Sequence, residues 1–180
     1  MSKLIIIRGN SGSGKSSLAR ELQYKFGRNT MVIPQDTVRR EMLHANDGVG
    51  NFAQPLMIEL LKYGRKNCEV VILEGILKSE WYTELFEAAQ SEFDRIYAYY
   101  YDIPFEETLN RHATKPQEKQ AQFGESEMRQ WWNEKDYIGF IPEKTLTKEL
   151  SLDDAVKLIY SEVSGGFDIK KGVQDGKNDG

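Results

Sequence analysis

Short runs of apolar residues alternate along the chain with longer stretches in which apolar residues return every three or four positions. The short runs are rich in β-branched and aromatic residues, which favours β-strands. Five strands are predicted, at residues 5–7, 31–33, 69–73, 95–101 and 144–146. The run at 69–73 is almost wholly apolar, which is typical of a parallel strand buried on both faces.

The stretches between these runs fit helices. Leu18, Leu22 and Phe26 share one face of a predicted helix that begins near Lys15. Similar patterns predict helices over residues 37–45, 52–66, 104–112 and 126–139, a helix capped by Ser79, and a closing helix over 152–163 that starts at a capping box.

This alternation predicts an α/β fold, a three-layer, doubly wound sandwich around a mostly parallel five-stranded sheet. One domain is expected over residues 1–164. Within it, the polar segment around residues 113–130 is predicted to be a small mobile lid. Residues 165–180, rich in Gly, Asp and Lys, are predicted to be a disordered tail.

Composition narrows the class of protein. The formal net charge of −4 and the pI near 5.4 argue against binding long nucleic acid through bulk electrostatics. The sequence contains no apolar run of the roughly 20 residues that span a bilayer and no signal-peptide pattern, so we expect a soluble cytoplasmic protein without a membrane partner. The single cysteine, Cys68, cannot form an internal disulfide.

Residues 9–16 read GNSGSGKS and lie between the first strand and the first helix. This is the context of a phosphate-binding loop, in which glycines let successive N–H groups point at an anion next to a helix N-terminus. Lys15 is expected to reach the β- and γ-phosphates, and Ser16 to ligate Mg²⁺. The predicted nucleotide-binding residues are Gly9, Asn10, Ser11, Gly12, Ser13, Gly14, Lys15, Ser16 and Ser17.

Two acidic residues follow the ends of predicted strands, Asp36 after the second and Glu74 after the third. Ligands of open parallel sheets bind outside the carboxyl ends of the strands, so both should lie near the phosphate loop. Glu74 is a candidate to help Ser16 organise Mg²⁺. Asp36 can cap the next helix, and with Arg39 it can also place a base and a cation at an acceptor hydroxyl.

Together, the segments GNSGSGKSS, IPQDTVR and ILEG and the arginine-bearing lid resemble the P-loop kinases of the nucleoside-monophosphate-kinase-like branch. The Asp36-x-x-Arg39 pair is similar to one in polynucleotide 5′-hydroxyl kinases, zeta-toxin sugar-nucleotide kinases and chloramphenicol phosphotransferases. The resemblance spans residues 3–163, and its specific part is the phosphate loop.

The resemblance implies a P-loop NTPase fold, ATP as donor and Mg²⁺ as cofactor. It implies that Asp36 accepts the proton of an acceptor hydroxyl and that Arg39 binds the acceptor or the transferred phosphoryl group. Lid cations neutralise charge in such kinases, and Arg111 and Arg129 are the candidates here. The segment RHATKPQ has lysine where further arginine is common, and lysine lacks the bidentate fork.

Three functions stay open. The first is an ATP-dependent kinase of a small hydroxyl acceptor, such as a nucleoside, a sugar derivative or an antibiotic. The second is a polynucleotide 5′-hydroxyl kinase, against which the acidic composition weighs. The third is a nucleotide-dependent switch or binding module, whose guanine-specific form is disfavoured because residues 133–136 read NEKD rather than Asn-Lys-x-Asp. The sequence does not indicate an oligomeric state.

Overall fold

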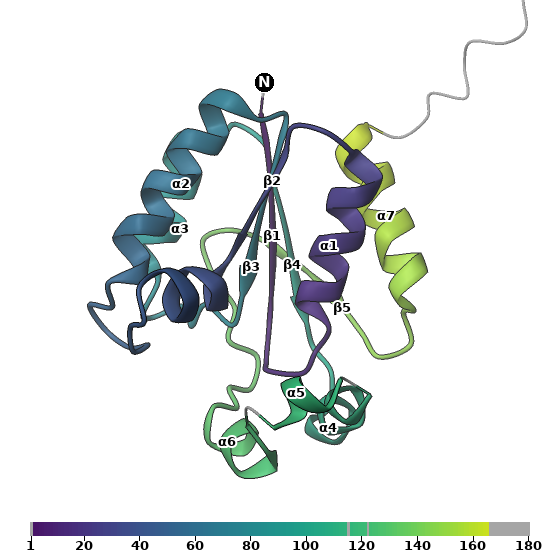
Figure 1. The fold of residues 1–180 in the computed structure, drawn as a ribbon. Helices are drawn as coiled ribbons and strands as arrows, with labels where there is room; N and C mark the ends of the chain where they lie inside the picture. The colour runs from purple at the N-terminus through teal and green to yellow at the C-terminus, as the bar shows by residue number, and fades with distance from the viewer. Residues whose placement is uncertain (1, 115, 122, 166–180) are drawn as a thin grey trace, which may run out of the picture.

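The computed structural model describes residues 2–114, 116–121 and 123–165 (Figure 1). Its sheet consists of β1 (Lys3–Gly9), β2 (Thr30–Pro34), β3 (Val70–Gly75), β4 (Ile96–Tyr101) and β5 (Glu143–Leu146). The strands are ordered β2-β3-β1-β4-β5, and every neighbouring pair is parallel. The carboxyl ends of the strands therefore share one edge, which is the lower edge in Figure 1.

Two pairs of helices cover the sheet (Figure 1). The helices α1 (Lys15–Phe26) and α7 (Leu152–Ser164) lie on one face, and α2 (Ala53–Asn67) and α3 (Thr83–Glu92) lie on the other. Three short helices, α4 (Phe105–Ala113), α5 (Gln117–Gln120) and α6 (Glu125–Gln130), gather below the carboxyl edge. The predicted three-layer P-loop fold with five strands is confirmed, and its sheet is parallel throughout.

The central strand β1 contributes to both cores because its side chains alternate between the two faces. Leu4 and Ile6 pack in the α2–α3 core, whereas Ile5 and Ile7 pack in the α1–α7 core. All four are fully buried, and burial of such a side chain contributes about 1.5–3 kcal/mol. The strand that ends in the phosphate loop is thus among the most firmly held elements.

The helix predicted over residues 37–45 is shorter and of another type. It is a π-helix, η1 (Thr37–Met42). His44 has a left-handed backbone with φ of 48°, so the chain has left the helix by that residue. Single π turns often occur at functional sites, and this one directly follows Asp36.

Two further helix predictions are wrong in part. The helix predicted over 126–139 ends at Gln130, because the following residues bond to the sheet instead, as when the Ile138 amide donates to the Glu143 carboxylate at 2.7 Å. Ser79 does not cap α3, which begins at Thr83. Its amide and hydroxyl donate to Asp136 instead.

A fully buried arginine on β1 holds this return segment. The Arg8 guanidinium lies 2.7 Å from an Asp136 carboxylate oxygen and 2.9 Å from one of Glu143. It also donates to the carbonyl oxygen of Leu77, and its cation lies over the rings of Phe86 and Tyr100. One buried cation thus joins β1 to β5 and to the chain that follows α6.

The boundaries of the predicted domain and lid remain predictions. Residues 113–130 form short helices in the described part rather than an irregular loop, and residues 166–180 of the predicted tail lie outside the described residues. Among the described helices, none has the length and apolar character needed to cross a membrane.

Candidate active site at the carboxyl edge of the sheet

The phosphate loop runs from the end of β1 at Gly9 to the start of α1 at Lys15. Gly9, Gly12 and Gly14 all have positive φ, as predicted. The value at Gly12 is +79°, and a Cβ placed there would lie 2.6 Å from the carbonyl oxygen of Thr108. The loop therefore needs glycine for its backbone conformation and for its close contact with α4.

Two cations lie against the loop. The Lys15 ammonium donates to the Asn10 carbonyl oxygen at 2.8 Å. The Arg111 guanidinium, from the last turn of α4, donates to the Ser13 carbonyl oxygen at 2.8 Å and pairs with Glu107 at 2.7 Å. Arg111 is thus brought to the loop, as the lid prediction requires.

Ser16 and Glu74 come together beside the loop. The Ser16 hydroxyl donates to a Glu74 carboxylate oxygen at 3.0 Å. Burial raises the pKa of Glu74 above its ordinary value, whereas Lys15 and the Ser16 hydrogen bond lower it and the charge of Asp36 raises it further. Because Pro34 of β2 pairs in register with Glu74 of β3, Asp36 and Glu74 lie at the same edge of the sheet.

These two oxygens suit the magnesium ion that the fold implies. Mg²⁺ prefers oxygen ligands and, at nucleotide sites, takes only one or two from the protein while phosphates and water supply the rest. Ser16 and Glu74 would hold it. Within the part of the chain that the structure describes, no group of three or more His, Cys, Asp or Glu residues could bind a metal by itself.

Asp36 lies just beyond β2, where Pro34 pairs in register with Glu74 of β3. Its side chain is 69% exposed and makes no N-cap hydrogen bond to η1. The carboxylate instead lies 3.0 Å from the Arg39 guanidinium and 3.4 Å from that of Arg40. Asp36 and Arg39 are therefore paired, whereas the predicted cap of η1 by Asp36 is not formed; the role of Asp36 as a base stays a prediction.

Arg129 is not brought to the loop in the same way. Its side chain is exposed, pairs with Glu125 at 2.8 Å and lies over the Phe105 ring. Ser11 is half-buried within the loop, and Ser17 is exposed beside Ser16 on the first turn of α1. Arg111 is therefore the better placed of the two predicted lid cations.

The side chain of Asn10 has a role that the sequence did not reveal. It donates to the Asn133 carbonyl oxygen at 2.6 Å and accepts from the Asn133 amide at 2.9 Å. This reciprocal pair fastens the phosphate loop to the chain that returns from α6. The motif pattern leaves the residue after the first glycine unspecified, so only the structure could identify this contact.

A second missed group, Asp47, lies next to Arg39. Asp47 accepts hydrogen bonds from the buried side chains of Gln35, at 3.0 Å, and Tyr82, at 2.7 Å. The only sequence signal was its place in the turn-rich segment of residues 46–51. Arg40 also lies 6.0 Å from the ring of Trp131, so η1 contacts the chain that follows α6.

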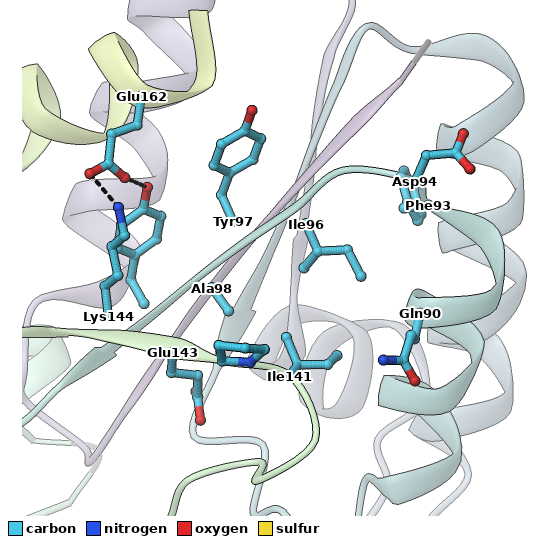
Figure 2. Close-up of a pocket in the computed structure, with 12 residues that line it drawn as sticks. Gln90, Phe93, Asp94, Ile96, Tyr97, Ala98, Ile141, Glu143, Lys144 and Glu162 are labelled. Carbon is cyan, nitrogen blue, oxygen red and sulfur yellow. Dashed lines mark hydrogen bonds and ion pairs between the residues drawn. The ribbon is translucent and has the colours of Figure 1, made fainter. Parts of the chain in front are cut away.

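One surface hollow lies away from these residues. It measures about 610 Å³ and is walled by the first residues of β4, the end of α3 and the last turns of α7 (Figure 2). Its polar rim includes the ion pair between Lys144 and Glu162, with nitrogen and oxygen 2.6 Å apart. Since β4 begins there and ends beside Gly9, the hollow belongs to the opposite end of the sheet, and none of the predicted site residues lines it.

The arrangement has the parts of a phosphoryl-transfer site. A backbone nest, Lys15 and Arg111 form a positive side, and Ser16 with Glu74 offers oxygen ligands. Asp36 and Arg39 follow β2, which pairs with the strand β3 that carries Glu74. Such transfer depends mainly on positioning and on stabilising negative charge.

A family model described as an AAA domain matches residues 4–134. No curated protein matches the sequence. Similar solved structures include the tunicamycin resistance protein of Deinococcus radiodurans, with a TM-score of 0.63, 18% identity, and coverage of 91% of this chain and 96% of that chain.

Two named kinases are also similar. A gluconokinase from Sinorhizobium meliloti gives a TM-score of 0.62 at 16% identity, covering 91% of this chain and 92% of its own. The Mycobacterium tuberculosis APS kinase, solved with AMPPNP and APS, gives 0.58 at 20% identity, covering 92% and 98%. At these identities the likeness establishes the fold.

Proposed function

This chain belongs to the AAA domain family, and from that premise we propose that it is an ATP-dependent kinase that transfers the γ-phosphoryl group to a hydroxyl of a small molecule. The observation that carries the proposal is the adjacency of two half-sites. The phosphate loop with Ser16 and Glu74 forms the donor half. Asp36 with Arg39 would form the acceptor half, and the pairing of Pro34 in β2 with Glu74 in β3 supports the adjacency of the two halves.

In the proposed reaction, Asp36 accepts the proton of the acceptor hydroxyl while the oxygen of that hydroxyl forms a bond to the γ-phosphorus. The bond from the γ-phosphorus to the β,γ-bridging oxygen breaks, and ADP leaves. Lys15 and Arg111 oppose the negative charge on the transferred group. Mg²⁺, when bound, would neutralise phosphate charge, and Ser16 and Glu74 would hold it. ATP and Mg²⁺ are plentiful in the cytoplasm, where we place the enzyme.

Labelled ATP and a panel of acceptors test the proposal. The panel should contain nucleosides, sugar nucleotides, aminoglycosides, tunicamycin and 5′-hydroxyl oligonucleotides. We expect labelled product in a small-molecule class. Label on oligonucleotides alone would favour a polynucleotide kinase, and ATP hydrolysis without any labelled acceptor would favour a nucleotide-dependent switch.

A variant of the base tests the mechanism. Asp36→Asn should lower kcat by about 100-fold or more, the contribution of a general base, while the KM for ATP stays within about twofold. Asp153→Asn, a change on the exposed first turn of α7, is the matched control. Full transfer activity in Asp36→Asn would refute the assignment of Asp36.

Paired lysine variants identify the lid cation. Arg111→Lys should lower kcat by about tenfold or more, because lysine lacks a fork that could hold Ser13 and the transferred group at once. Arg129→Lys should leave kcat within about twofold. The reverse ranking would move the lid role to Arg129.

A further inference from the structure

We propose that Asn10 is a positioning residue for the donor nucleotide. Its side chain braces the phosphate loop against the backbone of Asn133, so that the loop has its binding shape before the nucleotide arrives. This role rests on the proposed function, because the ligand of the loop is taken to be the triphosphate of ATP. The Asn10 side chain then supports the loop and does not itself contact the nucleotide.

Both polar groups of the Asn10 carboxamide are in use. Its nitrogen donates to the Asn133 carbonyl oxygen at 2.6 Å, and its oxygen accepts from the Asn133 amide at 2.9 Å. Asn10 is only 5% exposed, so water competes little for these groups. A carboxamide carries its donor and its acceptor on one planar group, and turning it over would place like groups against each other. The contact therefore fixes the side chain in one orientation.

The main chain of Asn10 receives the lysine of the loop. The Asn10 carbonyl oxygen accepts from the Lys15 ammonium at 2.8 Å and from the Ser13 amide at 3.3 Å. Because the side chain leaves the Cα next to this carbonyl group, holding the side chain limits rotation of the peptide. A shift of that peptide would move the Lys15 charge and the next turn of the loop together.

The glycines of the loop make such support necessary. Gly9 directly precedes Asn10, and Gly12 follows it two residues later, with φ of +144° and +79°. Glycine has more conformational freedom to lose than any other residue, so an unsupported loop would sample many shapes. The second half of the loop is held at Ser13, whose carbonyl oxygen accepts from Arg111 at 2.8 Å. Asn10 supplies the corresponding hold on the first half.

The partner side of the brace is itself fixed to the sheet. Asp136, three residues after Asn133, pairs with the buried Arg8 guanidinium at 2.7 Å. The Tyr100 hydroxyl lies 3.5 Å from the Asn133 carbonyl oxygen and accepts from the Asp136 amide at 3.4 Å. Arg8 and Tyr100 pair in register on β1 and β4. Asn10 therefore ties the phosphate loop to the two central strands through the return segment.

A braced loop should bind phosphates more tightly than a free one. Backbone N–H groups that already point at the phosphate position need not be ordered when the ligand arrives, which is the advantage of preorganisation. Loss of two hydrogen bonds that hold the loop should weaken binding of the phosphate chain by about tenfold. A purely structural role of Asn10 would instead reduce the amount of folded protein.

Calorimetry in the presence of Mg²⁺ separates these outcomes, with AMPPNP and, separately, inorganic tripolyphosphate as ligands. Asn10→Ala should raise the Kd of both ligands by about tenfold and leave the number of sites per chain unchanged. Fewer sites at an unchanged Kd would show only a loss of folded protein and would overturn the positioning role, with the kinase function left standing. Failure of the wild-type protein to bind AMPPNP would overturn the proposed function and this role with it.

Changes at Asn133 distinguish bracing from direct contact between Asn10 and the nucleotide. Asn133→Ala keeps both backbone groups and should leave the Kd of AMPPNP within about twofold of the wild-type value. Asn133→Pro removes the amide donor and should raise the Kd at least about threefold. Equal Kd values for these two variants would refute the brace even if Asn10→Ala did not fold. Glu134→Gln, a change to an exposed neighbour on the same segment, is the control and should leave the Kd unchanged.

A double variant completes the test. Asn10→Ala and Asn133→Pro break the same contact, so their combination should bind AMPPNP no more than about twofold more weakly than Asn10→Ala alone. If the two effects multiply instead, the residues act separately and the brace is refuted.

Discussion

Removing only the Glu143 charge from its buried ion pair with Arg8 should lower the free energy of unfolding more than removing both charges of the pair. Arg8 is fully buried, and the Glu143 side chain is 1% exposed. Glu143 accepts two contacts from the guanidinium, at 2.9 and 3.1 Å, and one from the Ile138 amide. Glu143→Gln therefore removes one of the two carboxylates that pair with the buried cation and leaves Asp136, whose side chain is 20% exposed, as the other.

The magnitudes follow from burial. Loss of one partner from a buried pair costs about 3–5 kcal/mol, mainly because the other charge stays buried. Adding Arg8→Met to Glu143→Gln removes that charge and replaces it with an apolar side chain. Asp136 keeps its hydrogen bonds from Ser79 and its access to water. The double variant should therefore recover at least about 1 kcal/mol relative to Glu143→Gln alone.

Urea unfolding followed by far-UV circular dichroism measures these changes, provided that the slope m is the same in all variants. Glu134→Gln, which alters an exposed carboxylate on the same return segment, should change the free energy of unfolding by less than about 0.5 kcal/mol. If Arg8→Met lowers the stability of Glu143→Gln further, the guanidinium stabilises the fold through packing rather than charge, and the reasoning fails.

Three further changes give measurable outcomes. Gly12→Ala should weaken ATP binding in calorimetry by about tenfold or more, because its Cβ would lie 2.6 Å from the Thr108 carbonyl oxygen. Unchanged affinity would contradict the claim that the phosphate loop needs glycine at this position. Glu74→Gln should raise the melting temperature of the nucleotide-free protein, since burial disfavours the charged carboxylate. The same change should reduce phosphoryl transfer by about tenfold or more. A lower melting temperature would contradict the idea that burying the Glu74 charge destabilises the protein. Burial raises the pKa of Tyr101 to about 12 from its ordinary value of 10.0, so the folded protein keeps a proton that the unfolded chain releases, and stability should fall as pH rises through this range. Tyr101→Phe should show a shallower fall in urea midpoints between about pH 9 and 11, and an equal slope would contradict the shift.

The sheet could be predicted because its signals are local. A strand buried on both faces appears as a continuous apolar run, and the phosphate-loop motif fixes the direction in which β1 meets α1. Asp36 and Glu74 could be assigned to one edge because parallel strands end together. The structure brings Ser16 to Glu74 and Asp36 to Arg39, and the roles assigned to these residues stay predictions.

The remaining features depend on residues far apart in sequence. Arg8 looks like the polar end of a strand until the structure shows its carboxylate partners 128 and 135 residues later. The apolar spacing after Gln130 matches a helix, but periodicity does not distinguish contacts with a helix partner from contacts with a sheet. Asp47 resembles an ordinary turn residue because Gln35 and Tyr82, which hold it, belong to other elements.

The packing of the two tryptophans after α6 gives the protein an optical reporter of its own. Trp131 lies edge-on to Phe123, and Trp132 lies edge-on to Phe105 of α4, while Trp81, the third tryptophan in the sequence, packs against the α2–α3 core. In a Trp81→Phe protein all indole emission would come from the neighbourhood of α6. Stopped-flow mixing with nucleotide or acceptor could then time rearrangements of that region in unlabelled protein, separately from the chemical step.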